Sequence, residues 1–309
     1  MSTFRYEPAP CVPFRDMAAI ERCRRITAQE IDKHPNPDFK IRVVPDESLV
    51  FLWIADMYAR MQQAAVAGRR CVMMMPNPWP GYRYLAHLIN STRLNCKHVW
   101  WFALDEYADQ DGNIAPEDWP RGFMYAMLTF LWKEIDEELR PPRSQVFGLR
   151  GNMEHYFDLM QEAGGVDIAY TGPGWTGHVA FVEPDAPEFA GSLAEWKTMG
   201  ARICTLSPFT LAQNSLHGST GMSGDLTAVP PKAATVGPRE IIAARCRWEM
   251  AGIGVHGTAT SWQRLIARLC YHGPVCPQLP SSINQQLRTD CYITQNIAAD
   301  IENTWNKGY

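Results

Sequence analysis

Two segments of the sequence carry side chains that can move protons. Asp105 and Glu106 follow an apolar run, and His178 and Glu183 lie in the glycine-rich stretch 172–184, GPGWTGHVAFVEP. Two consecutive carboxylates at the end of an apolar run are costly to bury unless they are paired or used. A histidine with a nearby carboxylate is a common acid–base pair. These residue types favour proton-transfer chemistry, with capping of a helix or turn as the alternative role of Asp105.

The glycines of the second segment allow close approach to a ligand. Gly172, Gly174 and Gly177 have no side chains, so the backbone and the imidazole of His178 can come near a bound molecule. The alternative is structural, because a lone histidine in a glycine loop is often part of the fold and many turns contain Gly-x-Gly. The residue types alone leave both interpretations open.

The surrounding sequence predicts the elements that position these residues. The predicted strands are the apolar runs 71–75, 97–107, 166–172, 201–206, 233–237, 248–255 and 291–294. The predicted helices are 46–68, 82–91, 117–139, 152–163 and 258–269. Such alternation predicts an α/β fold, with a mostly parallel, Rossmann-like sheet flanked by helices on both faces. Ligands of such sheets bind beyond the carboxyl ends of the strands, where the two acid–base segments are expected.

The chain divides into two unequal parts. Residues 1–46 are rich in proline and charge, and we expect them to form an N-terminal extension. Residues 47–309 contain no internal repeat and no obvious linker, so we expect a single α/β domain there.

Composition excludes several classes of protein. The formal charge of -4 and pI near 6.1 are unlike those of a nucleic-acid-binding domain. No apolar run approaches the roughly 18 residues of a membrane span, and the first residues do not resemble a secretory signal, so we expect a cytoplasmic protein that binds neither membrane nor nucleic acid. The nine cysteines are scattered and form no zinc-type spacing. We expect no metal and no cofactor.

Together the two acid–base segments resemble the glucosamine-6-phosphate deaminase/isomerase family. That family has a strand ending in Asp-Glu-Tyr, matched by LDEY at 104–107, and a loop G-x-G-x-D-G-H-x-A-F-N-E-P, matched at 172–184. The segments 205–215 and 233–237 look like later parts of the family sequence, and the likeness covers residues 48–275. Related 6-phosphogluconolactonases share the fold, but their loop reads G-H-T-A-S-L-F-P, so this chain is more similar to the deaminases.

The resemblance implies a role for each matching residue. Asp105 would move a proton between C1 and C2 of the open-chain sugar, and His178, supported by Glu183, would open the pyranose ring. We therefore expect Asp105 and His178 to face one cleft at the carboxyl edge of the sheet. The remaining motif residues are candidates for substrate contacts: Glu106, Tyr107, Gly172, Gly174 and Gly177.

The chain departs from the family pattern in the proton relay and at the phosphate site. Thr176 replaces the aspartate that precedes Gly-His, and a threonine holds no titratable proton at neutral pH. Asn77-Pro78-Trp79-Pro80 replaces a phosphate-cradling S/T-G-G-S/T-P turn, and its prolines cannot donate. Leu211 aligns with a phosphate-binding arginine and Thr260 with a lysine. Trp79 is expected either to stack on a sugar face or to lie in the core.

These departures shape the predicted function. We expect a glucosamine-6-phosphate isomerase/deaminase-like protein of amino sugar metabolism, with isomerase or deaminase (hydrolase) chemistry. It would perform aldose–ketose isomerisation, with or without ammonia release, on a sugar or amino sugar not bound through a 6-phosphate in the family's way. The alternative is a non-catalytic sugar-binding or regulatory protein, since Thr176 interrupts the relay. Oligomers are common in the resembled family, so a homo-oligomer stays open. Arginines that could restore an anion site are Arg83, Arg239 and Arg264.

Overall fold

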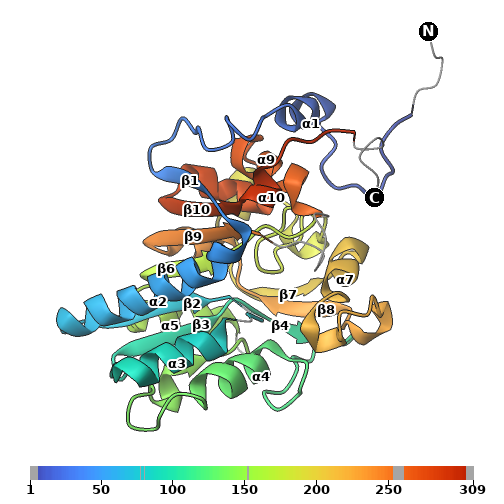
Figure 1. Cartoon of the computed structure of the whole chain (residues 1–309). Helices are drawn as coiled ribbons and strands as arrows, with labels where there is room; N and C mark the ends of the chain where they lie inside the picture. Colours follow the sequence, from blue (N-terminus) through green and yellow to red (C-terminus); the bar gives the residue numbers. More distant parts are fainter. Residues whose placement is uncertain (1–5, 77, 80, 152, 253–260, 304–309) are drawn as a thin grey trace.

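The computed structural model describes residues 6–303 except 77, 80, 152 and 253–260. Within these residues, a seven-stranded parallel sheet has the order β1-β10-β9-β6-β2-β3-β5, and a smaller antiparallel sheet has the order β4-β8-β7 (Figure 1). The strands are β1 Phe39–Val44, β2 Cys71–Met75, β3 Val99–Ala103, β4 Asp105–Ala108, β5 Val146–Phe147, β6 Ile168–Thr171, β7 Arg202–Thr205, β8 Lys232–Thr235, β9 Cys246–Ala251 and β10 Thr289–Thr294.

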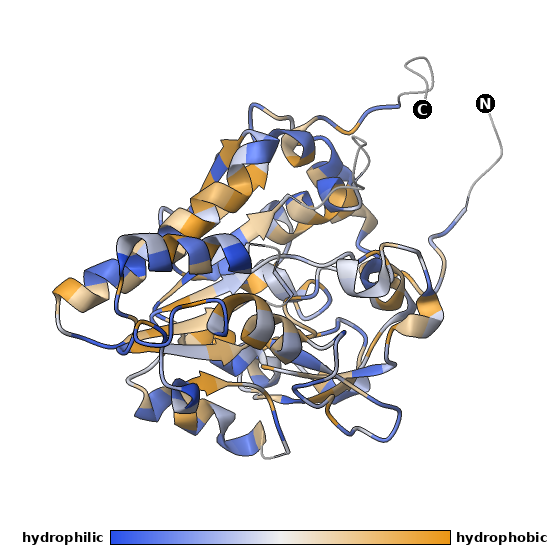
Figure 2. Cartoon of the chain, turned by 60° about the horizontal axis from the view of Figure 1, so that its bottom comes forward, coloured by the Kyte–Doolittle hydropathy of each residue, from blue (hydrophilic) through white to orange (hydrophobic). Residues whose placement is uncertain are grey.

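Helices cover both faces of the large sheet. They are α1 Met17–Arg24, α2 Leu49–Val66, α3 Tyr82–Thr92, α4 Phe123–Met127, α5 Tyr156–Glu162, α6 Leu193–Trp196, α7 Pro208–Asn214, α8 Pro238–Ala243, α9 Gln263–His272 and α10 Gln295–Ala298. In Figure 2 the longer helices carry hydrophilic residues beside hydrophobic ones, as expected for helices with one side packed on a sheet. The predicted α/β fold is confirmed.

The alternation of side chains along the strands separates two cores. In β2, Met73 and Met75 join a hydrophobic cluster with α2, α3 and α4, whereas Val72 and Met74 join a second cluster with α5 and the small sheet. A third cluster lies between α1, α9 and the strands β1 and β10 at one end of the sheet. Because successive residues of a strand point to opposite faces, a continuous apolar run fills both cores at once.

The chain leaves the large sheet at Leu104. The sequence predicted one strand over 97–107, but β3 ends at Ala103 and β4 starts at Asp105, where it pairs antiparallel with β8. The backbone N–H of Val236 donates to the Leu104 carbonyl at 2.9 Å, which directs the chain toward the small sheet. The predicted strands at 201–206 and 233–237 therefore belong to this second, antiparallel sheet, which the sequence analysis did not anticipate.

Part of the expected N-terminal extension belongs to the large sheet. Residues Phe39–Val44 form β1, which pairs in parallel with β10 from Phe39 opposite Thr289 to Val44 opposite Thr294. The buried Phe39 and Ile41 alternate with exposed Lys40 and Arg42, a strand pattern that the surrounding prolines obscured. The sheet thus begins before the boundary expected at residue 46.

Among the described residues, no helix is both long and apolar enough to cross a membrane.

Candidate active site

Asp105 is a buried carboxyl group at the start of β4. Its side chain is almost fully enclosed, at 5% exposed, and Oδ1 has no hydrogen-bond partner among the described residues. Burial, and then the neighbouring Glu106, raise the pKa of Asp105 well above its usual range. A buried polar atom without a partner calls for an explanation, and an incoming ligand that donates to Oδ1 would supply one.

Glu106 has a different role from the expected substrate contact. Its carboxylate accepts the backbone N–H groups of Phe123 at 3.0 Å, Met124 at 2.8 Å and Tyr107 at 2.8 Å. It therefore holds the first turn of α4, where helical N–H groups lack partners within the helix. Burial raises the pKa of Glu106, and the three N–H groups oppose that shift. With all these bonds made, Glu106 is a structural carboxylate in this structure.

Tyr107 is likewise a packing residue. Its ring lies 4.6 Å from that of Phe123 and 5.9 Å from that of Phe181, and it is part of the core beneath the small sheet. Burial raises the pKa of Tyr107 far above its ordinary value. The tyrosine of the DEY motif thus packs against Phe181 of the 172–184 loop.

His178 is held by two hydroxyl groups and a carboxylate. Its Nδ1 lies 3.0 Å from Thr176 Oγ1 and 3.1 Å from Thr210 Oγ1, and Glu183 Oε2 is 3.8 Å away. Thr176 Oγ1 donates to Glu183 Oε2 at 3.3 Å, and the Ser207 N–H donates to Glu183 Oε1 at 3.3 Å. Burial lowers the pKa of His178, and the charge of Glu183 opposes the shift, so the imidazole is neutral at pH 7.

These contacts fit both neutral forms of His178. Thr176 donates its hydrogen to Glu183 and so accepts from a protonated Nδ1, whereas the Thr210 hydroxyl can donate to an unprotonated Nδ1. In the form with the proton on Nδ1, Nε2 is the acceptor that a general base requires. The threonine that replaces the family's aspartate thus bridges histidine and glutamate, so the relay is reorganised.

The glycines fit closely around the imidazole. A side chain at Gly174 would overlap Nε2 of His178, so only glycine allows the ring to sit there. Gly177 has a φ of +81°, and its N–H donates to the Gly174 carbonyl at 2.9 Å. A side chain at Gly172 would meet the Met250 carbonyl at 2.6 Å. The loop therefore needs its glycines to place His178.

Two links bring the Asp105 strand beside the His178 loop. Asp105 lies opposite Thr235 in the small sheet, and Thr235 Oγ1 accepts the Phe181 N–H at 3.0 Å. The buried thiol of Cys204 donates to the Phe181 carbonyl at 3.0 Å, and burial followed by the charges of Glu183, Glu188 and Asp105 raises its pKa. Asp105 and Glu183 thus lie within electrostatic reach of one buried group.

A cleft among the described residues is lined by Glu106. It has a volume of about 750 Å³, and its walls include Asn113, Glu117, Arg150 and Ile203. Neither Asp105 nor His178 lines it, so the expected shared open cleft is not this one. Both side chains are enclosed, at 5% and 4% exposed.

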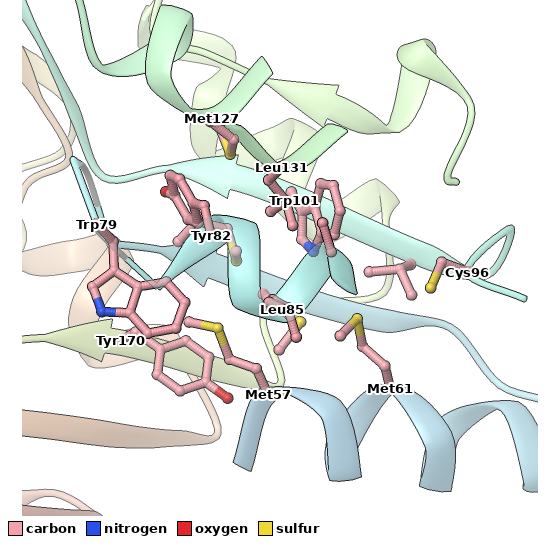
Figure 3. Packing of buried hydrophobic residues seen from close by; sticks show 14 of the residues in the cluster. Met57, Met61, Trp79, Tyr82, Leu85, Cys96, Trp101, Met127, Leu131 and Tyr170 are labelled. Atoms are coloured by element: carbon pink, nitrogen blue, oxygen red, sulfur yellow. The ribbon is translucent and has the colours of Figure 1, made fainter. Parts of the chain in front are cut away.

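Trp79 lies in the hydrophobic core. Its ring is 4.9 Å from that of Trp53 and 5.6 Å from that of Tyr82, and only 5% of the residue is exposed. Figure 3 shows its indole among Tyr82, Tyr170 and Met57. Of the two alternatives for Trp79, the structure shows core packing, which corrects its assignment as a sugar contact.

The structure describes only some of the other residues expected at the missing phosphate site. Leu211 lies in α7, half-buried against the core beneath the small sheet. Asn77 and Thr260 lie outside the described residues. The arginines that could replace the missing cations have contacts elsewhere: Arg83 over Phe130, Arg239 with Glu240, and Arg264 with Asn296.

Comparisons with known proteins agree with the motifs. No protein-family model matches the chain. The glucosamine-6-phosphate deaminase of Rhodopirellula baltica is 27% identical over 268 residues, covering 85% of this chain and 95% of that protein. The enzyme of Phocaeicola vulgatus is 30% identical over 176 residues, and this match covers 55% of the chain and 59% of that protein.

Solved structures share the fold at lower identity. A monomeric glucosamine-6-phosphate deaminase of the NagB superfamily matches 84% of this chain and 98% of its own, with TM-score 0.66 and 19% identity. The 6-phosphogluconolactonase of Thermotoga maritima matches 83% of this chain and 99% of its own, with TM-score 0.56 and 13% identity. The chain is thus similar in sequence to glucosamine-6-phosphate deaminases and shares its fold with deaminases and 6-phosphogluconolactonases. The resemblance predicted from LDEY and GPGWTGHVAFVEP is confirmed.

Two contacts of the candidate site were not predicted. Thr210 and Ser207, at the first turn of α7, bind His178 and Glu183 respectively. Ser207-Pro208 is a typical helix start, and the Ser207 hydroxyl accepts the Thr210 N–H at 3.2 Å. That pattern in SPFT would have located the helix, but its docking on His178 depends on tertiary structure.

Proposed function

We propose that the protein is a sugar isomerase of the deaminase type, acting on a sugar or amino sugar without a phosphate clamp of the family's kind. The reaction is aldose–ketose isomerisation, with or without release of ammonia. The observation that carries the proposal is the presence of two buried acid–base groups on adjoining segments: Asp105, with its unpartnered Oδ1, and His178, whose Nδ1 is bonded to hydroxyl groups, so that Nε2 is its acceptor when Nδ1 carries the proton.

Ring opening would be the task of His178. Its Nε2 accepts the proton of the anomeric hydroxyl and returns it to the ring oxygen, so that the C1–O5 bond breaks and an aldehyde forms. The positive charge that develops on the imidazole is stabilised through Thr176 and Glu183, which lies 3.8 Å from Nδ1. The imidazole packs directly against Gly174, which fixes the position of Nε2.

Isomerisation would be the task of Asp105. The ionised carboxylate removes the C2 proton of the open-chain sugar and returns it to C1, with the enediol, or enolamine for an amino sugar, as the intermediate. Because burial raises the pKa of Asp105, it is a stronger base than an exposed aspartate once ionised.

Proton exchange tests this assignment directly. Asp105→Asn is expected to abolish solvent-deuterium incorporation at C1 and C2 of glucosamine, read by NMR, while sugar binding is retained, because the amide is nearly isosteric but does not accept the proton. Asp111→Asn, an exposed carboxylate on the same segment, is the matched control and is expected to keep the wild-type rate. Undiminished exchange in Asp105→Asn would assign the base to another group.

A non-catalytic sugar-binding function is the second candidate. It is favoured by Thr176, which holds no titratable proton in the relay, and by the enclosure of both acid–base groups. A rise in melting temperature with sugar in the absence of any exchange would support this alternative.

A further inference from the structure

Glu249 is a buried carboxyl group that the proposed mechanism does not use. It lies in β9, opposite Thr171 of β6 on one side and Cys291 of β10 on the other, and none of its surface is exposed. Its Oε2 accepts hydrogen bonds from the Thr171 hydroxyl and, at 2.9 Å, from the side-chain amide of Asn284. Asn284 belongs to the 3-10 helix η8, Pro280–Gln286. Glu249 therefore joins the end of β6 to this short helix.

The surroundings of Glu249 contain more acceptors than donors. Its Oε1 and the Oδ1 of Asn284 are both buried without a hydrogen-bond partner among the described residues. Arg247, two residues earlier in β9, directs its guanidinium to backbone carbonyls, among them those of Ala244 and Arg288 at 2.9 Å. A proton on Oε1 would turn one unpartnered acceptor into a donor and remove the buried charge. The hydrogen bonds thus favour the neutral acid.

The other titratable groups within electrostatic reach of Glu249 are uncharged at neutral pH. Cys270 and Tyr271 come from α9 and Cys291 from β10, and burial raises the pKa of all three. β6 and η8 contribute a hydroxyl and an amide group. Among the described residues, Arg247 is the only charged group that acts on Glu249, and burial still raises the pKa of Glu249 to about 7.

The same two elements hold the loop that carries His178. In η8, the Ser281 N–H donates to the Gly177 carbonyl at 2.8 Å, and the Ser281 hydroxyl donates to the His178 carbonyl at 3.2 Å. Thr171 is the last residue of β6, so the loop begins directly after the side chain that bonds to Glu249. The backbone around His178 is therefore held by two elements that one carboxyl group joins.

We propose that Glu249 is a positioning residue of the candidate site, which as a neutral acid holds β6 and η8 in the arrangement that places His178. The proposal rests on the proposed function, because the step that depends on this placement is proton transfer by His178. Ionisation of Glu249 would leave a buried charge in contact with Asn284, whose own oxygen has no donor, and this favours separation of η8 from β9. The placement is kept while Glu249 is protonated and lost as the pH rises through its ionisation.

Backbone hydrogen exchange of the full-length protein without ligand tests the positioning role. Protection of the segments 172–184 and 280–286, corrected for the intrinsic pH dependence of exchange, is expected to fall about tenfold in the wild type between pH 6 and pH 8.5. Glu249→Gln is neutral at both pH values and is expected to keep its protection within threefold. Glu137→Gln, at an exposed carboxylate, is the matched control and should follow the wild type.

Two results of this measurement would overturn the proposal. One is wild-type protection that is the same at both pH values, which decides the question even if Glu249→Gln does not fold. The other is an equal fall in α3, the internal reference, because the effect would then be a loss of global stability.

Deuterium exchange at C1 and C2 of glucosamine separates the positioning role from the proposed function. Above pH 7, kcat of the wild type is expected to fall relative to that of Glu249→Gln, with KM within threefold. The amino group of glucosamine titrates equally in both assays, so the ratio of the two proteins isolates Glu249. Protection that depends on pH only in the wild type, without any deuterium exchange into the sugar, supports the positioning role and contradicts isomerisation. Equal pH profiles of kcat in the two proteins overturn the positioning role and leave isomerisation intact.

Discussion

The segments that follow β6 and β2 leave neighbouring strands at the same edge of the sheet, yet they differ in what they bury. The loop 172–184 after β6 encloses a hydrogen-bonded histidine, threonine and glutamate. The segment 76–81 after β2 places an indole in the core. Two segments at the same edge of one sheet thus bury different groups, a hydrogen-bonded polar cluster in one and an aromatic ring in the other. The two halves of a binding site can change independently when they lie on separate strand ends.

The largest expected effect is a difference in stability between variants of Trp79 and Trp175, the tryptophans of these two segments. Trp79→Ala is expected to lower the free energy of unfolding by about 3–5 kcal/mol, because it leaves a large cavity among Trp53, Tyr82 and their neighbours. Trp175→Ala is expected to cost less than about 1 kcal/mol, since that ring is partly exposed. Denaturant unfolding of both variants checks the contrast. A Trp79→Ala variant as stable as the wild type would place its indole outside the core.

A buried glutamate beneath the 172–184 loop gives a pH-dependent stability. Glu249 bonds to Thr171 and to Asn284, and burial raises its pKa to about 7. Between pH 4.5 and 7 the folded state retains a proton that the unfolded state has released, so the free energy of unfolding falls by about 3 kcal/mol as pH rises.

Glu249→Gln removes this titration. The variant is expected to gain stability over the wild type at pH 8 but not at pH 4, as measured by denaturant unfolding at both values. Glu137→Gln, at an exposed carboxylate, is the control and should follow the wild type. An unchanged pH slope in Glu249→Gln would show that folding does not raise the pKa of Glu249.

The next effect tests the fit of the imidazole. Gly174→Ala is expected to displace His178 and reduce deuterium exchange about 100-fold, because the added methyl group overlaps Nε2. Gly218→Ala is the matched control, since a Cβ there meets no atom within 4 Å. If Gly174→Ala exchanged at the wild-type rate, Nε2 of His178 would not be the acceptor.

The smallest effect concerns the bridging hydroxyl. Thr176→Val keeps the shape but breaks the contact between His178 and Glu183, so we expect exchange to fall about tenfold. Thr176→Ser keeps the hydroxyl and should retain activity, which distinguishes a relay from a packing role. Equal rates in Thr176→Val and Thr176→Ser would remove Thr176 from the relay.

The sequence predicted which segments form strands better than it predicted which strands pair with each other. The runs 71–75 and 166–172 closely predicted β2 and β6, because strands buried on both faces form continuous apolar runs. The break at Leu104 was not visible, since its cause is a hydrogen bond from Val236, which is distant in the sequence. The predicted helix 117–139 was too long, because α4 begins only after Gly122 and continues as a π-helical segment over Leu128–Trp132.

The same distinction holds for the candidate site. Asp105, His178 and Glu183 could be chosen as candidates from their motifs, because residue types and local spacing are properties of the sequence. The cap formed by Glu106 and the contact of Thr210 with His178 depend on how α4 and α7 dock. The choice for Trp79 between sugar and core was open for the same reason, since burial is decided by tertiary packing.

The most direct measurement compares deuterium exchange at C1 and C2 of glucosamine and of glucosamine 6-phosphate under identical conditions. The account predicts exchange that requires Asp105 and that shows no advantage of the phosphosugar in kcat/KM. A retained anion site with two charge-assisted contacts would favour the phosphosugar by about two to four orders of magnitude. A preference of that size would contradict the proposal that the protein keeps the proton-transfer groups but lacks the family's phosphate site.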